Sequence, residues 1–364
     1  MRKIELLGLT GIRFYAALTV YITHAVEKLP GTDALMGSSV ILQAGSNAVS
    51  FFFVLSGFIL AYNYADHFRG GVSLSRYKRF VWDRLARIYP VHLLTLLLVV
   101  PIAMLSPNNP LDWRAFPFHL TLLQCWWPSS SPLWFSYFNT PSWSISCEWF
   151  FYVLAPLAIF LSLRNSRKWV PLTLTLVYVF GIGWFLGYSQ PDRTRTHFVN
   201  FFAPSRFAEF LAGVYVARLF LASPERKLSW ASRGMQVSGV LFIVLGAISK
   251  QFSIWPFRGG LLIIPGAALL ILGLAYGHGQ FVAHLSRPWL NRLGVASFSL
   301  YMVHDPILRA VRGTFFYLGW EVRSWPMFLA IGLVVFLLAQ IAALMVCYGF
   351  EIPMQKRLRS MLNA

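Results

Sequence analysis

Charge, and acidic charge above all, is scarce in this sequence. Of its 364 residues 12% are charged, and only 13 are Asp or Glu, against 31 that are Lys or Arg. A water-soluble domain of this length needs far more charge to cover its surface, whereas 57% of these residues are hydrophobic. The composition therefore argues against an ordinary soluble protein and predicts an integral membrane protein.

Cysteine is also scarce, and several catalytic motifs do not occur. The three cysteines, Cys125, Cys147 and Cys347, form no CxxC pair, so we expect neither a disulfide framework nor a metal cluster. The histidines stand too far apart in the sequence to place two metal ligands on one helix, and we expect no metal cofactor. The sequence contains no G-x-S-x-G elbow and no Walker loop.

Long apolar runs between basic loops predict an all-α, polytopic fold of about ten transmembrane helices. The expected spans are 9–28, 40–64, 88–106, 142–163, 169–188, 204–222, 235–250, 259–276, 294–313 and 326–350. Alternate loops, beginning with the N-terminal residues, hold 20 of the 31 lysines and arginines. This positive-inside bias predicts that both termini are cytoplasmic. It also explains the net charge of +18 without nucleic acid as a partner.

The first expected span carries two ionisable residues, Arg13 and His24. They are 11 positions apart, so at ~100° per residue they share one helix face and stand roughly 16 Å apart along it. Ionisable groups inside a membrane are costly to place and are functional candidates. A slender ligand could run from the cation to the imidazole. The alternative is that Arg13 snorkels to the cytoplasmic interface and His24 bonds a neighbouring helix.

The most basic segment, residues 65–87, precedes the third expected span. Arg84 and Arg87 stand at i, i+3 on one helix face, and their planar donors suit phosphate oxygens. The segment is thus a candidate cytoplasmic phosphate site, to which Arg79 could contribute. A topology anchor that contacts anionic membrane lipid explains the same charges.

Other polar residues fall within expected spans. Ser144 and Glu148 stand at i, i+4, and the carboxylate needs a partner from another helix unless it is protonated. Arg206 and Glu209 stand at i, i+3 and can pair within one helix, either as a structural pair or as part of a site.

A third polar group occurs in the segment 293–305. Tyr301 and His304 stand at i, i+3, with Asp305 next to the histidine. His304 faces the same cavity as His24 or lies near the outer interface, and the sequence does not distinguish between these positions.

Together, six stretches in order resemble the acyltransferase-3 family of bacterial membrane acyltransferases, over most of the chain. Arg13 and His24 fit its R-x10-H signature, and the other blocks are FFFVLSGFIL, RLARIYP, PSWSISCEWFFY, RFAEFLAG and LGVASFSLYMVH. One departure is Cys147, where the family often has a larger aliphatic residue. The soluble-type H-x4-D arrangement of glycerolipid acyltransferases is absent, since Leu29 stands where the aspartate would be.

The resemblance implies transfer of an acyl group, usually acetyl from acetyl-CoA, to a hydroxyl of an extracytoplasmic acceptor. We expect a glycan or lipid-linked saccharide acceptor, as in exopolysaccharide or O-antigen synthesis, and a multi-pass protein of the bacterial cytoplasmic (inner) membrane. Some family members carry a fused extracytoplasmic domain. Here we expect one transmembrane domain, 1–364, without it.

The same resemblance suggests a role for each candidate residue. His24 would act as general base on the acceptor hydroxyl or as a transient acyl carrier, with Glu148, or else Glu27, orienting its ring. Cofactor phosphates would bind Arg84 and Arg87. The remaining assignments are Arg13 and Arg79 as cofactor-binding residues, Ser144 and Tyr301 as oxyanion donors, and Arg206, Glu209 and His304 as structural support.

Two other classes fit part of this pattern. A transporter or flippase of a glycan or lipid-linked intermediate shares the many spans and buried charges, but it would not need a cationic phosphate site aligned with a buried histidine. A regulatory membrane scaffold would tolerate loss of both His24 and Arg84.

Overall fold

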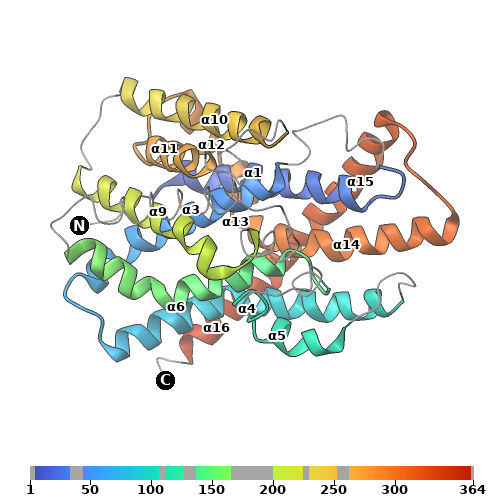
Figure 1. Ribbon diagram of the computed structural model, residues 1–364, viewed down its shortest axis with the longest axis horizontal. Coiled ribbons are helices and arrows are strands. Elements are labelled where there is room, and N and C mark those ends of the chain that lie inside the picture. Colours follow the sequence, from blue (N-terminus) through green and yellow to red (C-terminus); the bar gives the residue numbers. More distant parts are fainter. Residues whose placement is uncertain are drawn as a thin grey trace, which may run out of the picture.

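The computed structural model describes residues 5–32, 44–105, 112–126, 137–164, 200–223, 229–251 and 262–361. All regular elements in these ranges are helical, in agreement with the all-α prediction (Figure 1). They are α1 (Leu7–Lys28), α3 (Gly45–Phe68), α4 (Leu74–Met104), η2 (Trp113–Ala115), α5 (Phe116–Leu120), α6 (Ser142–Arg164), α9 (Ala203–Ala222), α10 (Ser229–Gln251), α11 (Ile263–Ala275), α12 (Gln280–Leu285), α13 (Pro288–Val295), α14 (Ser297–Leu318), α15 (Trp325–Val346), the π-helical η3 (Cys347–Glu351) and α16 (Ile352–Ser360).

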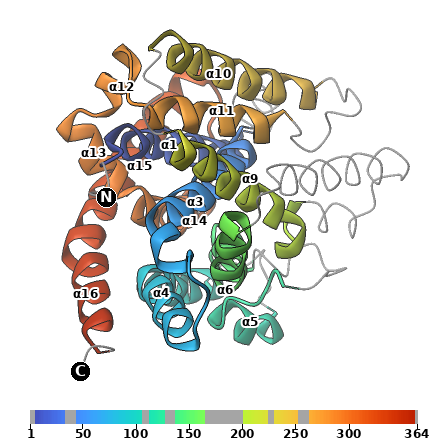
Figure 2. The ribbon, with the colours of Figure 1, turned by 90° about the vertical axis from the view of Figure 1, so that its left-hand side faces the viewer.

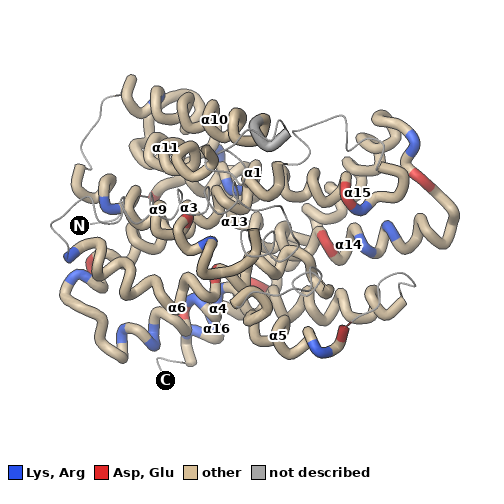
Figure 3. The backbone as a smooth tube through the Cα atoms, viewed as in Figure 1, with Lys and Arg blue, Asp and Glu red and all other residues tan. Residues whose placement is uncertain are grey.

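The long helices lie side by side along the longest dimension of the molecule (Figure 1). Helices α1 and α3 occupy the middle of the bundle, with α10 and α11 on one side and α4, α5 and α6 on the other (Figure 2). Both termini lie toward one end, at the left of Figure 1. Many lysines and arginines lie toward this same end, and others lie at the opposite end, on α14, near α15 and below α5 (Figure 3).

The centre of the bundle is the contact between α3 and α9, which two glycines make possible. A Cβ at Gly57 would lie 2.0 Å from the carbonyl oxygen of Phe210, and a Cβ at Gly213 would lie 1.9 Å from that of Val54. Only glycine lets the two backbones approach so closely, as at many interfaces between membrane helices. Helix α3 also packs against α1, and there it forms one wall of the site described below.

Five helical segments are long and apolar enough to cross a membrane: α3, α4, α6, residues 229–248 of α10, and residues 325–360, which run from α15 through η3 to α16. The chain is therefore a polytopic membrane protein. The number of ten spans and the cytoplasmic position of both termini stay predictions. The expected span 169–188 lies outside the described residues.

Two helices differ in extent from the expected spans. Helix α4 begins at Leu74, ahead of the expected span 88–106, because Ser73 caps it by accepting a hydrogen bond from the Arg76 amide (3.4 Å). The expected span 294–313 is divided between α13 and α14. Between them Ala296 has ψ 0°, well away from the ψ near −42° of a regular helix. The early start of α4 places Arg84 and Arg87 on the same continuous helix as the third span.

Candidate active site

A cavity of about 450 Å³ lies between α1, α3, α4, α6 and α14. It is lined by six of the residues that the sequence predicted for the site, namely Arg13, Arg84, Arg87, Ser144, Glu148 and Tyr301. We call it the arginine cavity. Its three guanidinium groups outnumber its two carboxylates, those of Glu5 and Glu148, and this balance favours an anionic ligand.

The arginine cavity extends from one end of the bundle into its interior. Glu5 and Asn63 line it near the start of α1 and the end of α3, at the end of the bundle that holds both termini. Ser144 and Tyr301 line it among the buried residues, where they are 4% and 6% exposed. A ligand that enters beside the arginines can therefore reach deep into the protein.

Arg84 and Arg87 on α4 are held at the cavity wall by aromatic rings and polar contacts. The Arg84 guanidinium lies over the rings of Tyr64 and Phe80, 5.4 Å and 6.0 Å from their centres, and its Nη2 donates to the Tyr64 hydroxyl (3.1 Å). Arg87 lies over the ring of Phe298 at 5.7 Å. Aromatic faces and a neutral acceptor hold the Arg84 guanidinium without neutralising its charge. Arg87 also forms an ion pair with the buried carboxylate of Glu351. Of the two arginines, Arg84 therefore keeps its full charge at the cavity wall.

Arg79, the fourth candidate for phosphate contact, is different. Its side chain is exposed on α4, and it does not line the arginine cavity. It is two turns away from Arg87 on the same helix, which makes it a matched control for the arginines that do.

Glu148 lies at the cavity wall, but its hydrogen bond goes to a neighbour on α6. Its carboxylate accepts from the Tyr152 hydroxyl (2.6 Å). Ser144 and Tyr301 bind one another: the Ser144 hydroxyl donates to the carbonyl of Pro141 (3.0 Å), so the Tyr301 hydroxyl donates to Ser144 (2.8 Å). The two predicted oxyanion donors therefore form one hydrogen-bonded pair at the end of the cavity.

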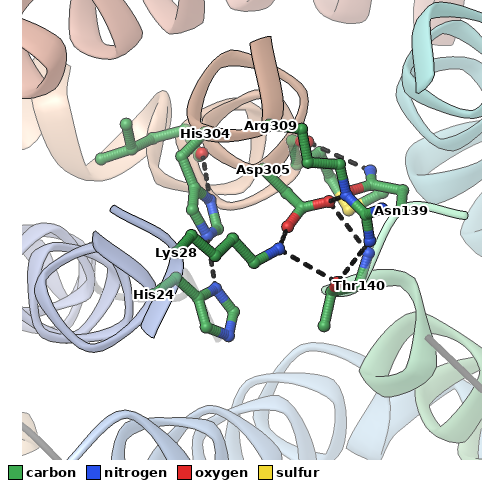
Figure 4. Close-up of polar contacts among 9 residues, drawn as sticks. His24, Lys28, Asn139, Thr140, His304, Asp305 and Arg309 are labelled. Carbon is green, nitrogen blue, oxygen red and sulfur yellow. Dashed lines mark hydrogen bonds and ion pairs between the residues drawn. The ribbon is translucent and has the colours of Figure 1, made fainter. Parts of the chain in front are cut away.

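His24 is hydrogen-bonded to His304 on α14, through its Nδ1 and the partner's Nε2 (2.7 Å; Figure 4). The prediction that Glu148 or Glu27 orients this ring is thereby corrected, because His304 takes the place of the carboxylate. The sequence could not distinguish these partners, since the two histidines are 280 positions apart. It also left open whether His304 faces His24, and the structure shows that it does.

The hydrogen bonds assign the protons of the neutral pair. Nδ1 of His304 lies 3.1 Å from the carbonyl oxygen of Leu300, which can only accept, so this nitrogen carries the proton. Nε2 of His304 then accepts from Nδ1–H of His24. The remaining nitrogen of His24, Nε2, points away from His304 and keeps its lone pair (Figure 4). A general base requires such an unprotonated nitrogen with a lone pair that can accept a proton.

A network of charges surrounds the histidine pair at the C-terminal end of α1 (Figure 4). Asp305 is completely buried and forms ion pairs with Lys28 and with Arg309, the latter at 2.8 Å. Thr140 joins them: its amide donates to Asp305 (3.1 Å), and its hydroxyl accepts from Lys28 (3.1 Å) and Arg309 (2.9 Å). The sequence analysis did not single out Lys28, Thr140 or Arg309, although Lys28 and Arg309 each follow a polar site residue at i, i+4.

The histidine pair lies just beyond the end of the arginine cavity. The Tyr301 ring lines the cavity and is centred 6.1 Å from the His304 ring and 6.3 Å from that of Phe52. His24 and His304 are not among the lining residues. Tyr301, which borders both the cavity and the His304 ring, therefore separates the two.

Arg206 and Glu209 form a buried pair away from the arginine cavity. Nη2 of Arg206 lies 3.0 Å from the Glu209 carboxylate and donates to the Ser50 hydroxyl (3.1 Å). The guanidinium also lies over the rings of Phe53 and Trp143. These contacts connect α9 with α3 and α6, which is the arrangement expected of a structural brace.

The helices and the site together define a polytopic membrane protein with a cationic cavity beside a histidine pair. A family model described as an acyltransferase domain matches residues 6–344. The chain belongs to this family, acyltransferase-3, and is an acyltransferase.

Individual relatives agree with this assignment. The acyltransferase MdmB of Streptomyces mycarofaciens is 31% identical over 326 residues, which cover 85% of this chain and 80% of that protein. The O-acetyltransferase OatA of Staphylococcus aureus is 25% identical over 83% of this chain and 50% of its own length. YrhL of Bacillus subtilis, named as a candidate peptidoglycan O-acetyltransferase, is 23% identical over 83% of this chain and 48% of its own length. The chain thus matches about half of the last two proteins. No solved structure matches it.

Proposed function

We propose that this acyltransferase moves an acetyl group from acetyl-CoA, bound from the cytoplasmic side of a bacterial inner membrane, to a sugar hydroxyl of a surface glycan. Exopolysaccharide and O-antigen are the glycans we favour. The observation that carries the proposal is the arginine cavity, which brings Arg13, Arg84 and Arg87 together and ends next to the His24–His304 pair.

The donor side rests on charge and shape. Coenzyme A carries several phosphate charges, and guanidinium groups bind phosphate through parallel N–H donors. A cavity of about 450 Å³ falls within the range of ~300–1,000 Å³ that is usual for ligand pockets. It would hold the pantetheine arm while the phosphates stay near Arg84 and Arg87. The basic residues at this end of the bundle agree with a cytoplasmic entrance.

The chemical step uses the lone pair on Nε2 of His24. This nitrogen takes the proton of the acceptor hydroxyl while the hydroxyl oxygen attacks the thioester carbonyl carbon. The tetrahedral intermediate then collapses, the C–S bond breaks, and the leaving thiolate takes the proton from His24. The products are the acetyl ester and free CoA.

Delivery of the thioester to His24 requires a movement at the end of the cavity. Tyr301 must turn aside, because its ring stands between the cavity and His304. That rotation would release its hydroxyl from Ser144, so that the Tyr301 hydroxyl becomes a donor for the oxyanion of the intermediate. Ser144 could add a second donor only if its hydroxyl also turned away from the Pro141 carbonyl.

The acceptor side rests on the position of His24 and on one relative. His24 lies in the last two turns of α1, away from the end that holds both termini. An acceptor would therefore arrive from the extracytoplasmic face. The name of YrhL supports a glycan as the class of acceptor.

The test is acetyl transfer by the purified protein in detergent, with acetyl-CoA and candidate glycans, followed as CoA release. We expect glycan-dependent release in the wild type and loss of transfer in His24→Ala, with unchanged expression and membrane insertion. Retained transfer by that variant would remove His24 from the chemistry. Acetyl-labelled protein without acceptor would instead support the acyl-carrier role.

A further inference from the structure

A buried carboxylate that the sequence analysis did not single out reaches the site from the C-terminal part of the chain. Glu351 is the last residue of η3 and is 1% exposed. It forms an ion pair with Nη1 of Arg87 and accepts a hydrogen bond from the Ser299 hydroxyl (2.5 Å). A buried carboxylate is stable only when it is paired and hydrogen-bonded in this way.

The π-helical geometry of η3 explains how Glu351 reaches Arg87. A π turn holds one residue more than an α turn, so it rotates the residues that follow by ~100° about the helix axis. Such insertions inside α-helices occur frequently at functional sites. Here the insertion falls between α15 and α16, where the chain passes α4.

The segment after Glu351 is fixed against α4 as well. Nε1 of Trp82 donates to the carbonyl oxygen of Leu358 (2.8 Å), and Arg359 pairs with Asp83 at 3.5 Å. Helix α16 descends on the same flank of the bundle as α4 (Figure 2). Glu351 is therefore held rigidly, with α15 on one side and α16 on the other.

The Arg87 guanidinium both binds Glu351 and lines the arginine cavity. Glu351 binds it at Nη1 and the Phe298 ring covers one face at 5.7 Å, while the side chain also lines the arginine cavity. An arginine has five N–H donors in a fixed plane, so holding one edge sets the direction of the others. The orientation of Arg87 toward the cavity is thus determined before any ligand binds.

We propose that Glu351 is a positioning residue for Arg87: it holds the guanidinium in the orientation that binds a phosphate group of the acyl donor. This inference rests on the proposed donor site. Two effects of Glu351 oppose one another. Its negative charge weakens binding of a phosphate nearby, whereas its anchoring of Arg87 removes the entropy that a mobile arginine would lose on binding.

Two substitutions separate these effects. Glu351→Gln removes the charge and keeps an oxygen that can accept from Arg87, whereas Glu351→Ala removes both. Positioning predicts that Glu351→Ala raises the KM for acetyl-CoA about tenfold or more, because the freed arginine must be ordered by the ligand. Glu351→Gln should stay within about threefold of the wild type, since the anchor is retained.

Acetyl-pantetheine is the donor that tests the role directly, because it lacks the phosphates of CoA. Its turnover should be the same in Glu351→Ala and in the wild type. The control is Glu321→Ala, which removes an exposed carboxylate paired with Arg323 at 3.8 Å. It should change neither donor's kinetics.

Each outcome decides between the two roles. An unchanged or lowered KM for acetyl-CoA in Glu351→Ala would overturn the inference, and so would an equal loss with acetyl-pantetheine, which would mark Glu351 as structural. If Glu351→Ala does not fold, Glu351→Asp carries the test, because its shorter side chain keeps the charge but withdraws the carboxylate from Nη1 of Arg87. An unchanged KM for acetyl-CoA in that variant overturns the inference. If Arg87→Ala leaves the KM for acetyl-CoA unchanged, the donor site itself is wrong.

Discussion

The His24–His304 hydrogen bond allows the sharpest test of the site, because it predicts how two variants combine. His304→Ala leaves His24 in place but removes the acceptor that holds its proton on Nδ1 and fixes its ring. His24→Ala removes the general base itself. Neither residue lines the arginine cavity, so the KM for acetyl-CoA should stay near the wild-type value in both.

The expected magnitudes follow from the roles. General base catalysis contributes ~10²–10⁴-fold in rate, so kcat should fall by about that factor in His24→Ala. Residues that orient a ligating or reacting histidine typically contribute ~10–100-fold, or about 1.4–2.7 kcal/mol of barrier, which is the loss we expect in His304→Ala. His304→Gln should recover most of this loss, because its amide oxygen can accept from Nδ1–H of His24.

The assay is single-turnover transfer of labelled acetyl with saturating acetyl-CoA and acceptor. Residues that act as one unit give non-additive losses, so the double variant should be no slower than His24→Ala alone. The control is His284→Ala, which removes a histidine bonded to the Tyr15 hydroxyl (2.7 Å) outside the cavity lining and should keep wild-type kcat. If the two losses simply multiply in the double variant, His304 does not act through His24.

Two further predictions concern the donor site and the bundle. Arg84→Ala and Arg87→Ala should each raise the KM for acetyl-CoA ~10–100-fold, because a hydrogen bond to a charged group contributes about 1.5–3 kcal/mol. Arg79→Ala should leave this KM unchanged. Steady-state kinetics measure the three values, and equal effects of all three substitutions would contradict a specific site. Gly213→Ala should destabilise the protein by ~1–3 kcal/mol, because its Cβ would lie 1.9 Å from a backbone oxygen of α3. The midpoint of thermal unfolding in detergent measures this loss of stability. The control is Gly234→Ala, whose Cβ would have no neighbouring atom within 4 Å. Equal midpoints for the two variants would contradict the close contact of α3 and α9.

Much of the fold was readable from composition and periodicity. Scarce charge and long apolar runs predicted a polytopic helical protein, and segments such as 142–163 and 204–222 lie within one or two residues of helices α6 and α9. The expected spans do not give the full extent of each helix: α4 begins at Leu74, well before the expected span 88–106, because Ser73 caps a helix that includes the basic residues. Hydropathy identifies the segments that are apolar enough to lie in a membrane, and it does not show where a helix continues beyond the membrane into water.

The candidate residues came from the sequence, but their partners did not. Spacing on one helix placed Arg13 with His24 and Arg84 with Arg87, because residues on a common face follow from helical geometry alone. Only the tertiary structure paired His24 with His304 instead of a carboxylate, and brought Glu351 to Arg87 from 264 positions away. Such contacts depend on which helices pack together and on the register of each, including the extra residue in η3. The pairing and register of the helices are determined by packing across the whole bundle, so no local pattern of residues encodes them.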